Sequence, residues 1–356
     1  MSGSSVIFGL GTEIHASVDP VSQVPEREFD PLLCRAELEF REVFYPMGFA
    51  LEIKTNDRAV LAAARESWGD WSERYSAPPM RLTVNVMDDG ASEYPPTPTA
   101  RSYGHLFSMV ANANNQMICD LKAGIAFTCF SRVALHNSNF FRYHFLEAIA
   151  YTMLGALHAT PLHGACVSRN GHGMLFCGNS GAGKSTLAYA CARQGWTYTS
   201  DDATYLLRGT LPRVIGNSRQ VRFRPHALTL FPEIGDRALT PRAEGKPSIE
   251  VPTDELPGLI TSDEATIGNI IFLNRQPSAR AELIPLSYAS ILTYFKEALF
   301  PDIEVHALQM ASLEALATAD AYELRYEDLD SAIACLEGLS DAADLLNSTG
   351  RRDLSE

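Results

Sequence analysis

The sequence predicts an α/β protein in which a larger α/β domain follows a smaller α+β domain. The first observation is the segment 164–199, where short apolar runs alternate with glycine turns and one helical pattern, as in a sheet flanked by helices. The second is the glycine-rich segment GNSGAGKS (178–185), which lies between an apolar run and the helical pattern, the usual setting of a phosphate-binding loop. We place the two domains at 1–140 and 141–356.

Composition limits the class of protein. Of 356 residues, 46% are hydrophobic and 20% charged, enough to bury a sizeable core. The net charge of −14 argues against a nucleic-acid binder. The N-terminus resembles no signal peptide, and no apolar stretch is long enough to span a bilayer. We therefore expect a cytoplasmic protein without a membrane or nucleic-acid partner, whose seven scattered cysteines are reduced.

The N-terminal part shows strand and helix patterns in alternation. The segment 49–56 alternates like a strand, and 57–71 has apolar positions at helical spacing. The segment 81–89 predicts another strand, and 116–131 predicts two strands joined by a turn at Gly124. Proline-rich breaks occupy 92–103 and 237–258.

The C-terminal part begins with a helical pattern at 142–158. Helix 184–194 then lies among predicted strands at 164–168, 173–177, 197–199, around Val214 and at 269–273. A last strand, YELRY, precedes an amphipathic helix for which Asp328 or Asp330 is the expected N-cap.

The segment 178–185 matches the pattern GxxxxGK[ST]. Its glycines allow backbone N–H groups to turn inward and hold phosphate oxygens, helped by the N-terminus of the following helix. Lys184 is expected to reach the β- and γ-phosphates of ATP, and Ser185 to bind Mg²⁺ or Mn²⁺. The residues expected to contact the nucleotide are Gly178, Asn179, Ser180, Gly181, Ala182, Gly183, Lys184, Ser185 and Thr186.

An acidic pair, Asp201-Asp202, follows the strand predicted at 197–199. If that strand is a parallel neighbour of the strand before the loop, both end at the same edge of the sheet. One carboxylate can then bind the metal and the other can accept a proton from an attacking hydroxyl, although a turn cap is the alternative role. His163, before a predicted strand, is on its own more typical of a packed or surface histidine.

The segments LHGACVSRNGHGMLFCGNSGAGKS and RQGWTYTSDD resemble the catalytic domain of the HPr serine kinase/phosphorylase family, whose nucleotide-binding core is similar to that of phosphoenolpyruvate carboxykinases. The clear resemblance covers about 163–202. It implies an α/β P-loop kinase domain of the HPr-kinase/carboxykinase type, acting as an ATP-dependent kinase on a hydroxyl, above all a serine of a protein or peptide. It also implies a homo-oligomer.

Residue by residue, the resemblance makes Lys184 and Ser185 the phosphate and Mg²⁺ ligands. Asp201 corresponds to the base on the acceptor hydroxyl and Asp202 to a metal ligand, while His163 lines the phosphate pocket. We do not expect this chain to have the family's second activity, phosphorolysis of phosphoserine.

One segment departs from the family pattern. Where the family has Glu-Ile-Arg-Gly with a metal-binding acid, this chain reads RQVRFRPHALTLFPEIG, with Arg219, Arg222 and Arg224 and no acid before Glu233. These arginines, and Lys246, are candidate contacts to phosphate or to an acidic acceptor; a solvated strand edge and a surface lysine are the alternatives. Two other functions stay open: a kinase acting on a small molecule such as an amino acid or sugar, and a nucleotide-sensing regulator without transfer activity.

Overall fold

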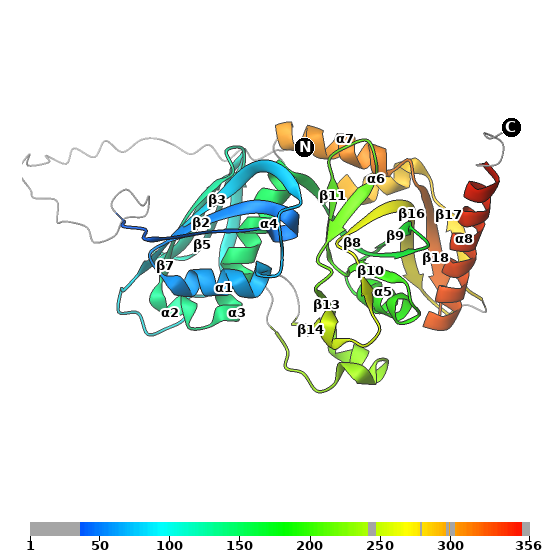
Figure 1. Cartoon of the computed structure of the whole chain (residues 1–356), viewed down its shortest axis with the longest axis horizontal. Coiled ribbons are helices and arrows are strands. Elements are labelled where there is room, and N and C mark those ends of the chain that lie inside the picture. Colours follow the sequence, from blue (N-terminus) through cyan, green and yellow to red (C-terminus); the bar gives the residue numbers. More distant parts are fainter. Residues whose placement is uncertain (1–35, 241–246, 278–279, 297–298, 300–302, 351–356) are drawn as a thin grey trace, which may run out of the picture.

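A computed structural model of the chain describes residues 36–240, 247–277, 280–296, 299 and 303–350. These residues form a mixed α/β fold of two halves, each built on its own sheet (Figure 1). The predicted α/β character is thus confirmed. Within the described part of the chain, no helix is both long and apolar enough to cross a membrane.

The first half is built on a seven-stranded sheet with the order β1-β2-β3-β7-β6-β5-β4. β2, β3 and β7 are parallel neighbours, and the other pairs are antiparallel. The predicted strands are present, and so is the turn at Gly124, whose φ is +67°; the proline-rich break at 92–103 contains a strand that the sequence did not predict. The strands are β1 (Phe40–Phe44), β2 (Phe49–Thr55), β3 (Tyr75–Met87), β4 (Thr99–Tyr103), β5 (Leu106–Asn112), β6 (Asn115–Asp120) and β7 (Ile125–Ser131).

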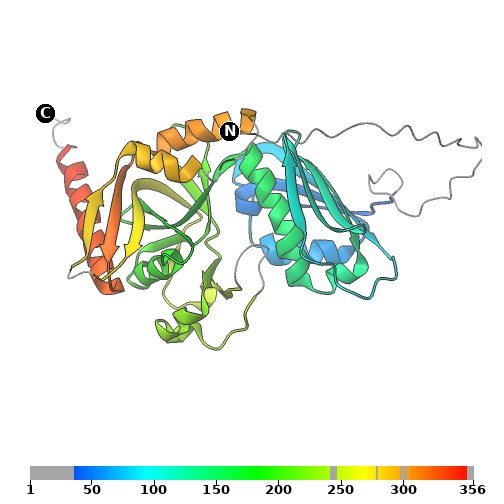
Figure 2. The same ribbon diagram turned by 180° about the vertical axis from the view of Figure 1, so that it is seen from behind.

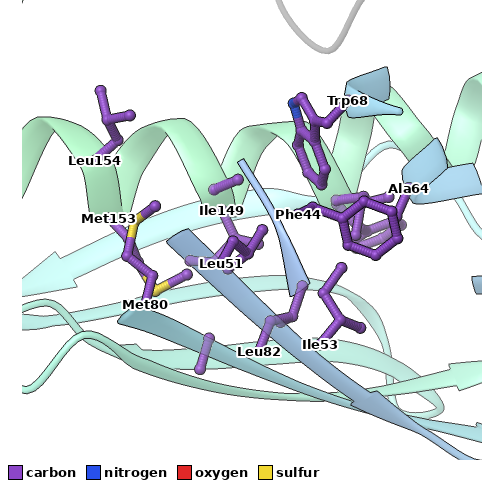
Figure 3. Close-up of a cluster of buried hydrophobic side chains, with 14 of the residues drawn as sticks. Phe44, Leu51, Ile53, Ala64, Trp68, Met80, Leu82, Ile149, Met153 and Leu154 are labelled. Atoms are coloured by element: carbon purple, nitrogen blue, oxygen red, sulfur yellow. The ribbon is translucent and has the colours of Figure 1, made fainter. Parts of the chain in front are cut away.

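Helices pack against this sheet and complete its core. Figure 3 shows Leu51 and Met80 of the sheet together with Ile149 and Met153 of α4, all of them fully buried. Helix α4, which follows the boundary drawn at residue 140, therefore takes part in the core of the first half. The helical segments are α1 (Arg58–Trp68), α2 (Arg132–Leu135), α3 (Ser138–Phe141), the π-helical turn η2 (Arg142–Leu146) and α4 (Glu147–Leu157).

The second half is built on a nine-stranded mixed sheet with the order β15-β10-β8-β11-β12-β16-β18-β17, in which β9 pairs with both β8 and β16. The predicted strands of this region are confirmed as its members. The strands are β8 (Ala159–Arg169), β9 (His172–Cys177), β10 (Thr197–Ser200), β11 (Ala203–Leu207), β12 (Arg213–Gly216), β15 (Ile260–Thr261), β16 (Glu264–Arg275), β17 (Glu282–Pro285) and β18 (Asp320–Tyr326).

The order of strands β9, β8 and β10 corrects one expectation. The sequence placed β10 as a direct parallel neighbour of β9, but β8 lies between them. Because β8 is antiparallel to both, β9 and β10 run in the same direction. Their carboxyl ends meet β8 close together, since Cys177 pairs with Gly164 and Ser200 pairs with Cys166.

Helices cover both faces of the second sheet. On one face, α5 and α8 enclose a core that includes Leu187 and Leu336; on the other, α6 and α7 enclose a core that includes Phe295 and Leu313. The helices are α5 (Lys184–Arg193), α6 (Tyr288–Lys296), α7 (Ile303–Leu316) and α8 (Leu329–Gly350). Of the two caps proposed for α8, Asp328 is the one that accepts a hydrogen bond from the N–H of Ser331, at 2.8 Å.

A small hairpin lies outside both sheets. Among the residues that the structure describes, strands β13 (Gln220–Phe223) and β14 (Ile249–Pro252) pair only with each other. Seen from behind, α4 lies between the seven-stranded sheet and the second half (Figure 2). The remaining short helices are η1 (Pro46–Gly48), η3 (Pro225–Thr229), η4 (Pro232–Ile234) and η5 (Thr253–Glu255).

Candidate functional site

The glycine-rich loop connects the end of β9 at Cys177 to the start of α5 at Lys184. Three of its glycines, Gly178, Gly181 and Gly183, have φ values of +144°, +90° and +98°. Side chains are strained in this region of backbone conformation, so glycine is required there. The motif found in the sequence therefore corresponds to a backbone shape that other residues would not adopt readily.

Lys184 lies with its side chain folded back over the loop. Its Nζ donates hydrogen bonds to the carbonyl of Gly178 at 2.7 Å and to that of Asn179 at 3.4 Å, and lies 3.0 Å from Nε2 of His163. Only 7% of the residue is exposed. Burial lowers the pKa of Lys184, while the charge of Asp202 acts in the opposite direction. A cation is thus held at the first turn of α5, where a phosphate group would bind.

His163 connects this lysine to the acidic pair. An ammonium group can only donate, so Nε2 of His163 accepts from Lys184 and Nδ1 carries the ring proton. That Nδ1 lies 3.4 Å from a carboxylate oxygen of Asp202. His163 pairs with Ala203 across β8 and β11, which fixes Asp202 beside it. The family resemblance predicted His163 at the phosphate pocket, and the strand register brings it beside the acidic pair.

Asp201 and Asp202 occupy a two-residue interruption between β10 and β11, which both pair with β8. Asp201 is 5% exposed, and its Oδ2 accepts a hydrogen bond of 2.7 Å from the backbone N–H of Arg222. Burial, followed by the charge of Asp201, raises the pKa of the Tyr198 hydroxyl well above its usual value. Through its hydrogen bond from Arg222, Asp201 also joins the β13–β14 hairpin to the main sheet.

These residues meet in one cavity of about 370 Å³, which we call the loop cavity. It brings six of the nine predicted loop residues, the acidic pair and His163 together with the hairpin region, which supplies His226 and Ser248 in addition to Arg222 and Arg224. Gly178, Asn179 and Ala182 are not among its lining residues. Its lining residues are His163, Ser180, Gly181, Gly183, Lys184, Ser185, Thr186, Asp201, Asp202, Arg222, Phe223, Arg224, His226 and Ser248.

A second cavity, of about 770 Å³, continues from the loop toward α8, and we call it the α5–α8 cavity. Gly181, Gly183, Thr186 and His226 line both cavities. The walls of the α5–α8 cavity combine apolar side chains with charged ones, namely Arg193, Arg275, Glu327, Asp328 and Asp330. Among its lining residues are Ala182, Leu230, Phe231, Arg275, Tyr326, Leu329 and Ile333.

Two tyrosines that the sequence analysis did not identify hold the loop. The hydroxyl of Tyr294, on α6, accepts from the N–H of Gly178 at 2.9 Å. The hydroxyl of Tyr326, at the end of β18, lies 3.4 Å from the carbonyl of Ala182. Both tyrosines are more than 100 residues from the loop in sequence, and no local pattern marks them.

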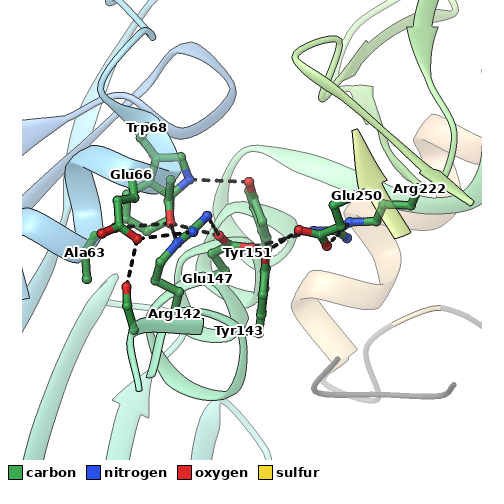
Figure 4. A network of polar contacts seen from close by, with 11 residues as sticks. Ala63, Glu66, Trp68, Arg142, Tyr143, Glu147, Tyr151, Arg222 and Glu250 are labelled. Carbon is green, nitrogen blue, oxygen red and sulfur yellow. Dashed lines mark hydrogen bonds and ion pairs between the residues drawn. The ribbon is translucent and has the colours of Figure 1, made fainter. Parts of the chain in front are cut away.

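The arginines predicted to contact the substrate have protein partners. Arg222 lies 2.9 Å from Glu250 and 3.9 Å from Glu147, as Figure 4 shows. Burial alone would lower the pKa of Arg222, but these two carboxylates outweigh it and hold the pKa above its usual value. Arg224 donates to the carbonyl of Pro247 at 3.2 Å.

The other predicted substrate contacts lie elsewhere. The guanidinium of Arg219 lies 5.1 Å from the centre of the Trp71 ring and 3.8 Å from Asp263, away from the loop cavity. Lys246 lies outside the described residues.

The donor set at the loop cavity fits a magnesium ion that is bound together with phosphate groups. Within the described ranges, no group of three or more His, Cys, Asp or Glu side chains is arranged to hold a metal by itself. In nucleotide sites, however, Mg²⁺ is usually bound by one or two carboxylates plus phosphates and water. Ser185 and Asp202 both line the cavity. Glu233 lies at the far end of α5, 2.9 Å from Arg193.

Comparisons with known proteins add little to this geometry. No protein-family model matches the chain, and no curated protein matches it. Among solved structures, the HPr(Ser) kinase/phosphatase from Coxiella burnetii is similar over 54% of this chain and 97% of its own, with 10% sequence identity and a TM-score of 0.33. At that TM-score the likeness does not bear on the function of this chain.

Proposed function

We propose that this chain binds ATP with Mg²⁺ in the loop cavity and transfers the γ-phosphate to a hydroxyl group. One observation carries the proposal. A buried lysine at the start of α5, held by a loop of three glycines with positive φ, shares a single cavity with Ser185 and two aspartates. Phosphoryl transfer requires mainly positioning and charge neutralisation, and this cavity supplies groups for both.

Each residue has a role in this proposal. Lys184 would leave the carbonyl of Gly178 and donate to phosphate oxygens together with the loop N–H groups. Ser185 and Asp202 would hold Mg²⁺, which when bound neutralises phosphate charge. The nucleoside would lie in the α5–α8 cavity, which continues from the loop.

The base belongs to the acidic pair. The sequence pattern favours Asp201, which lines the loop cavity. Asp202 is the next candidate, because it lines both the loop cavity and a further cleft that Phe107 and Ala148 also line. A carboxylate within reach of the acceptor hydroxyl accelerates transfer by taking its proton. A pure nucleotide sensor has no need of a base, so the pair favours an enzyme over a regulator.

The acceptor implied by the family resemblance is a serine of a protein or peptide, and we propose a cytoplasmic homo-oligomer as the acting form. Incubation with γ-labelled ATP and a cell extract, followed by separation of protein from small molecules, tests transfer. Calorimetric titration of Mg-ATP into the protein tests nucleotide binding independently. Absence of ATP binding would overturn the whole proposal. ATP binding without any labelled product would overturn transfer and support a nucleotide-sensing regulator instead. Light scattering during size-exclusion chromatography measures the assembly.

A further inference from the structure

A further cleft, distinct from the loop cavity and the α5–α8 cavity, has a volume of about 670 Å³ and lies between the two halves of the chain. We call it the inter-sheet cleft. One wall comes from β4 and β5 of the first sheet, another from α4 and the turn before it, and the third from β8, β11 and Arg222. Figure 4 shows part of its wall, where Tyr143, Tyr151 and Glu147 approach Arg222. Its volume is that of a typical small-molecule site.

The inter-sheet cleft meets the loop cavity. His163, Asp202 and Arg222 line both spaces. Lys184 and Ser185 line the loop cavity, whereas Phe107 and Ala148 line the cleft. A molecule in the cleft would therefore approach Asp202 and His163 from a different side than a phosphate group on the loop, which is the arrangement that transfer between two substrates requires.

The cleft has an apolar wall. Ala100 and Met109 are paired across β4 and β5, so their side chains share one face of the sheet, and Phe107 lies on the same face. Ala148 and Pro161 add to this wall from the other elements. Aromatic rings of three tyrosines also line the cleft: Tyr143, Tyr151 and Tyr205.

The polar groups of the cleft do not favour an acidic ligand. Glu147 and Asp202 are acidic, and the guanidinium of Arg222 is already paired with Glu250 and Glu147. His144 is 5% exposed, and its Nδ1 has no hydrogen-bond partner in the described part of the chain. Burial lowers the pKa of this histidine, which keeps it uncharged near neutral pH. The cleft thus offers apolar surface, neutral polar groups such as His144 and Thr152, and two carboxylates, without surplus positive charge.

We propose that the inter-sheet cleft is the acceptor site, and that the acceptor is a small uncharged alcohol with an apolar or aromatic body. This inference rests on the proposed kinase function and replaces the protein serine as acceptor. The hydroxyl oxygen bonds to the γ-phosphorus while the bond from that phosphorus to the β,γ-bridging oxygen breaks. ADP leaves with the electron pair, the hydroxyl proton passes to a carboxylate of the acidic pair, and the product is a phosphate monoester.

The test uses two variants of one exposed edge strand, Ala100→Trp and Thr99→Trp. Ala100 lines the cleft, whereas its neighbour Thr99 points to the opposite face of β4. The full-length wild type and both variants are incubated with γ-labelled ATP and a cell extract that has been filtered free of protein. Labelled small molecules are then separated and identified by mass spectrometry. Mg-ATP affinity is measured calorimetrically for all three proteins.

We expect a labelled phosphate monoester of a small alcohol with the wild type and with Thr99→Trp, and at least a tenfold loss of that product with Ala100→Trp at unchanged Mg-ATP affinity. Equal labelling by both variants would overturn the assignment of the cleft. Label that appears only on protein, when unfiltered extract is used, would overturn the small-molecule class and leave the proposed kinase intact. Absence of all label with intact ATP binding would overturn transfer, and loss of ATP binding in the wild type would overturn the nucleotide site itself.

Discussion

Lys184 is the residue on which the nucleotide site depends most. Its ammonium group is buried beside the loop carbonyls and His163, so Lys184→Ala removes a charge that the fold places at the phosphate position. Hydrogen bonds to charged groups contribute about 1.5–3 kcal/mol each, so we expect Mg-ATP affinity to fall by about tenfold or more and transfer to be lost. Calorimetric titration measures the first effect. Lys54→Ala, an exposed lysine of β2, is the control; equal affinities in all three proteins would remove the phosphate-binding assignment.

The acidic pair can be separated into base and metal ligand by two isosteric changes. Asp201→Asn keeps an oxygen that can accept the N–H of Arg222, so the local fold should persist. We expect turnover to fall by about two to four decades with little change in Mg-ATP affinity, the usual scale of general-base assistance. Asp202→Asn should instead raise the Mg²⁺ concentration needed for half-maximal activity. If the two variants show the reverse pattern in steady-state assays, the two roles are exchanged.

At the scale of elements, the loop and the first turn of α5 depend on glycine at position 183. Its φ of +98° costs a side-chain-bearing residue about 1–2 kcal/mol, and a Cβ would lie 3.1 Å from the hydroxyl of Tyr326. Gly183→Ala should therefore lower both the melting temperature and the Mg-ATP affinity. Gly195→Ala is the matched control, because Gly195 has a φ of +86° with open space around it. Similar nucleotide affinities for the two variants would contradict a binding role of the loop.

At the scale of the whole molecule, a largely buried charge cluster joins the two halves. Arg222 of the β13–β14 hairpin pairs with Glu250 of the same hairpin and approaches Glu147 of α4, while Tyr143 donates to Glu250. Removing one partner of a buried pair leaves an uncompensated charge, which costs about 3–5 kcal/mol. We therefore expect Glu250→Gln to lower the free energy of unfolding by that order.

The control for this prediction is an exposed ion pair. Glu255 lies 2.6 Å from Arg237 with 49% of its side chain exposed, and such pairs contribute less than about 1 kcal/mol. Urea unfolding of Glu250→Gln and Glu255→Gln compares the two. Equal midpoints would show that the cluster does not stabilise the junction.

Acid sensitivity is a second property of the whole molecule. His158 follows α4 and stacks on Phe49 of β2, with ring centres 4.7 Å apart. Burial, with a smaller contribution from Arg208, lowers its pKa from 6.5 to about 4. The unfolded chain therefore binds a proton in this range that the folded chain does not, so stability is full above pH 6.5 and falls as the pH drops toward 4.

Melting temperatures measured across this range test the effect. His158→Gln cannot take up the proton and should show a shallower decline than the wild type. An unchanged slope would assign the acid sensitivity to other groups.

Local patterns were sufficient for much of the second half. The unit of β9, the glycine-rich loop and α5 could be predicted from residues that are close together in the sequence. Its strand and helix show apolar periodicity, and its loop has glycines where the backbone requires positive φ. Strands β4 and β14 were missed because they lie in the proline-rich segments 92–103 and 237–258, which mask their short patterns. The order of β9, β8 and β10 could not be read from spacing, because pairing depends on contacts far apart in sequence.

The sequence by itself determined the glycine-rich loop, the lysine and serine that end it, and the acidic pair, because each is a local feature with a characteristic residue pattern. Only the tertiary structure decided that His163 lies between Lys184 and Asp202, that Tyr294 and Tyr326 hold the loop, and that Arg222 forms a largely buried ion pair with Glu250. It also decided that a cleft from the first sheet opens onto Asp202. These contacts join residues that are distant in the chain, and they form because the two sheets and α4 bury their apolar faces together.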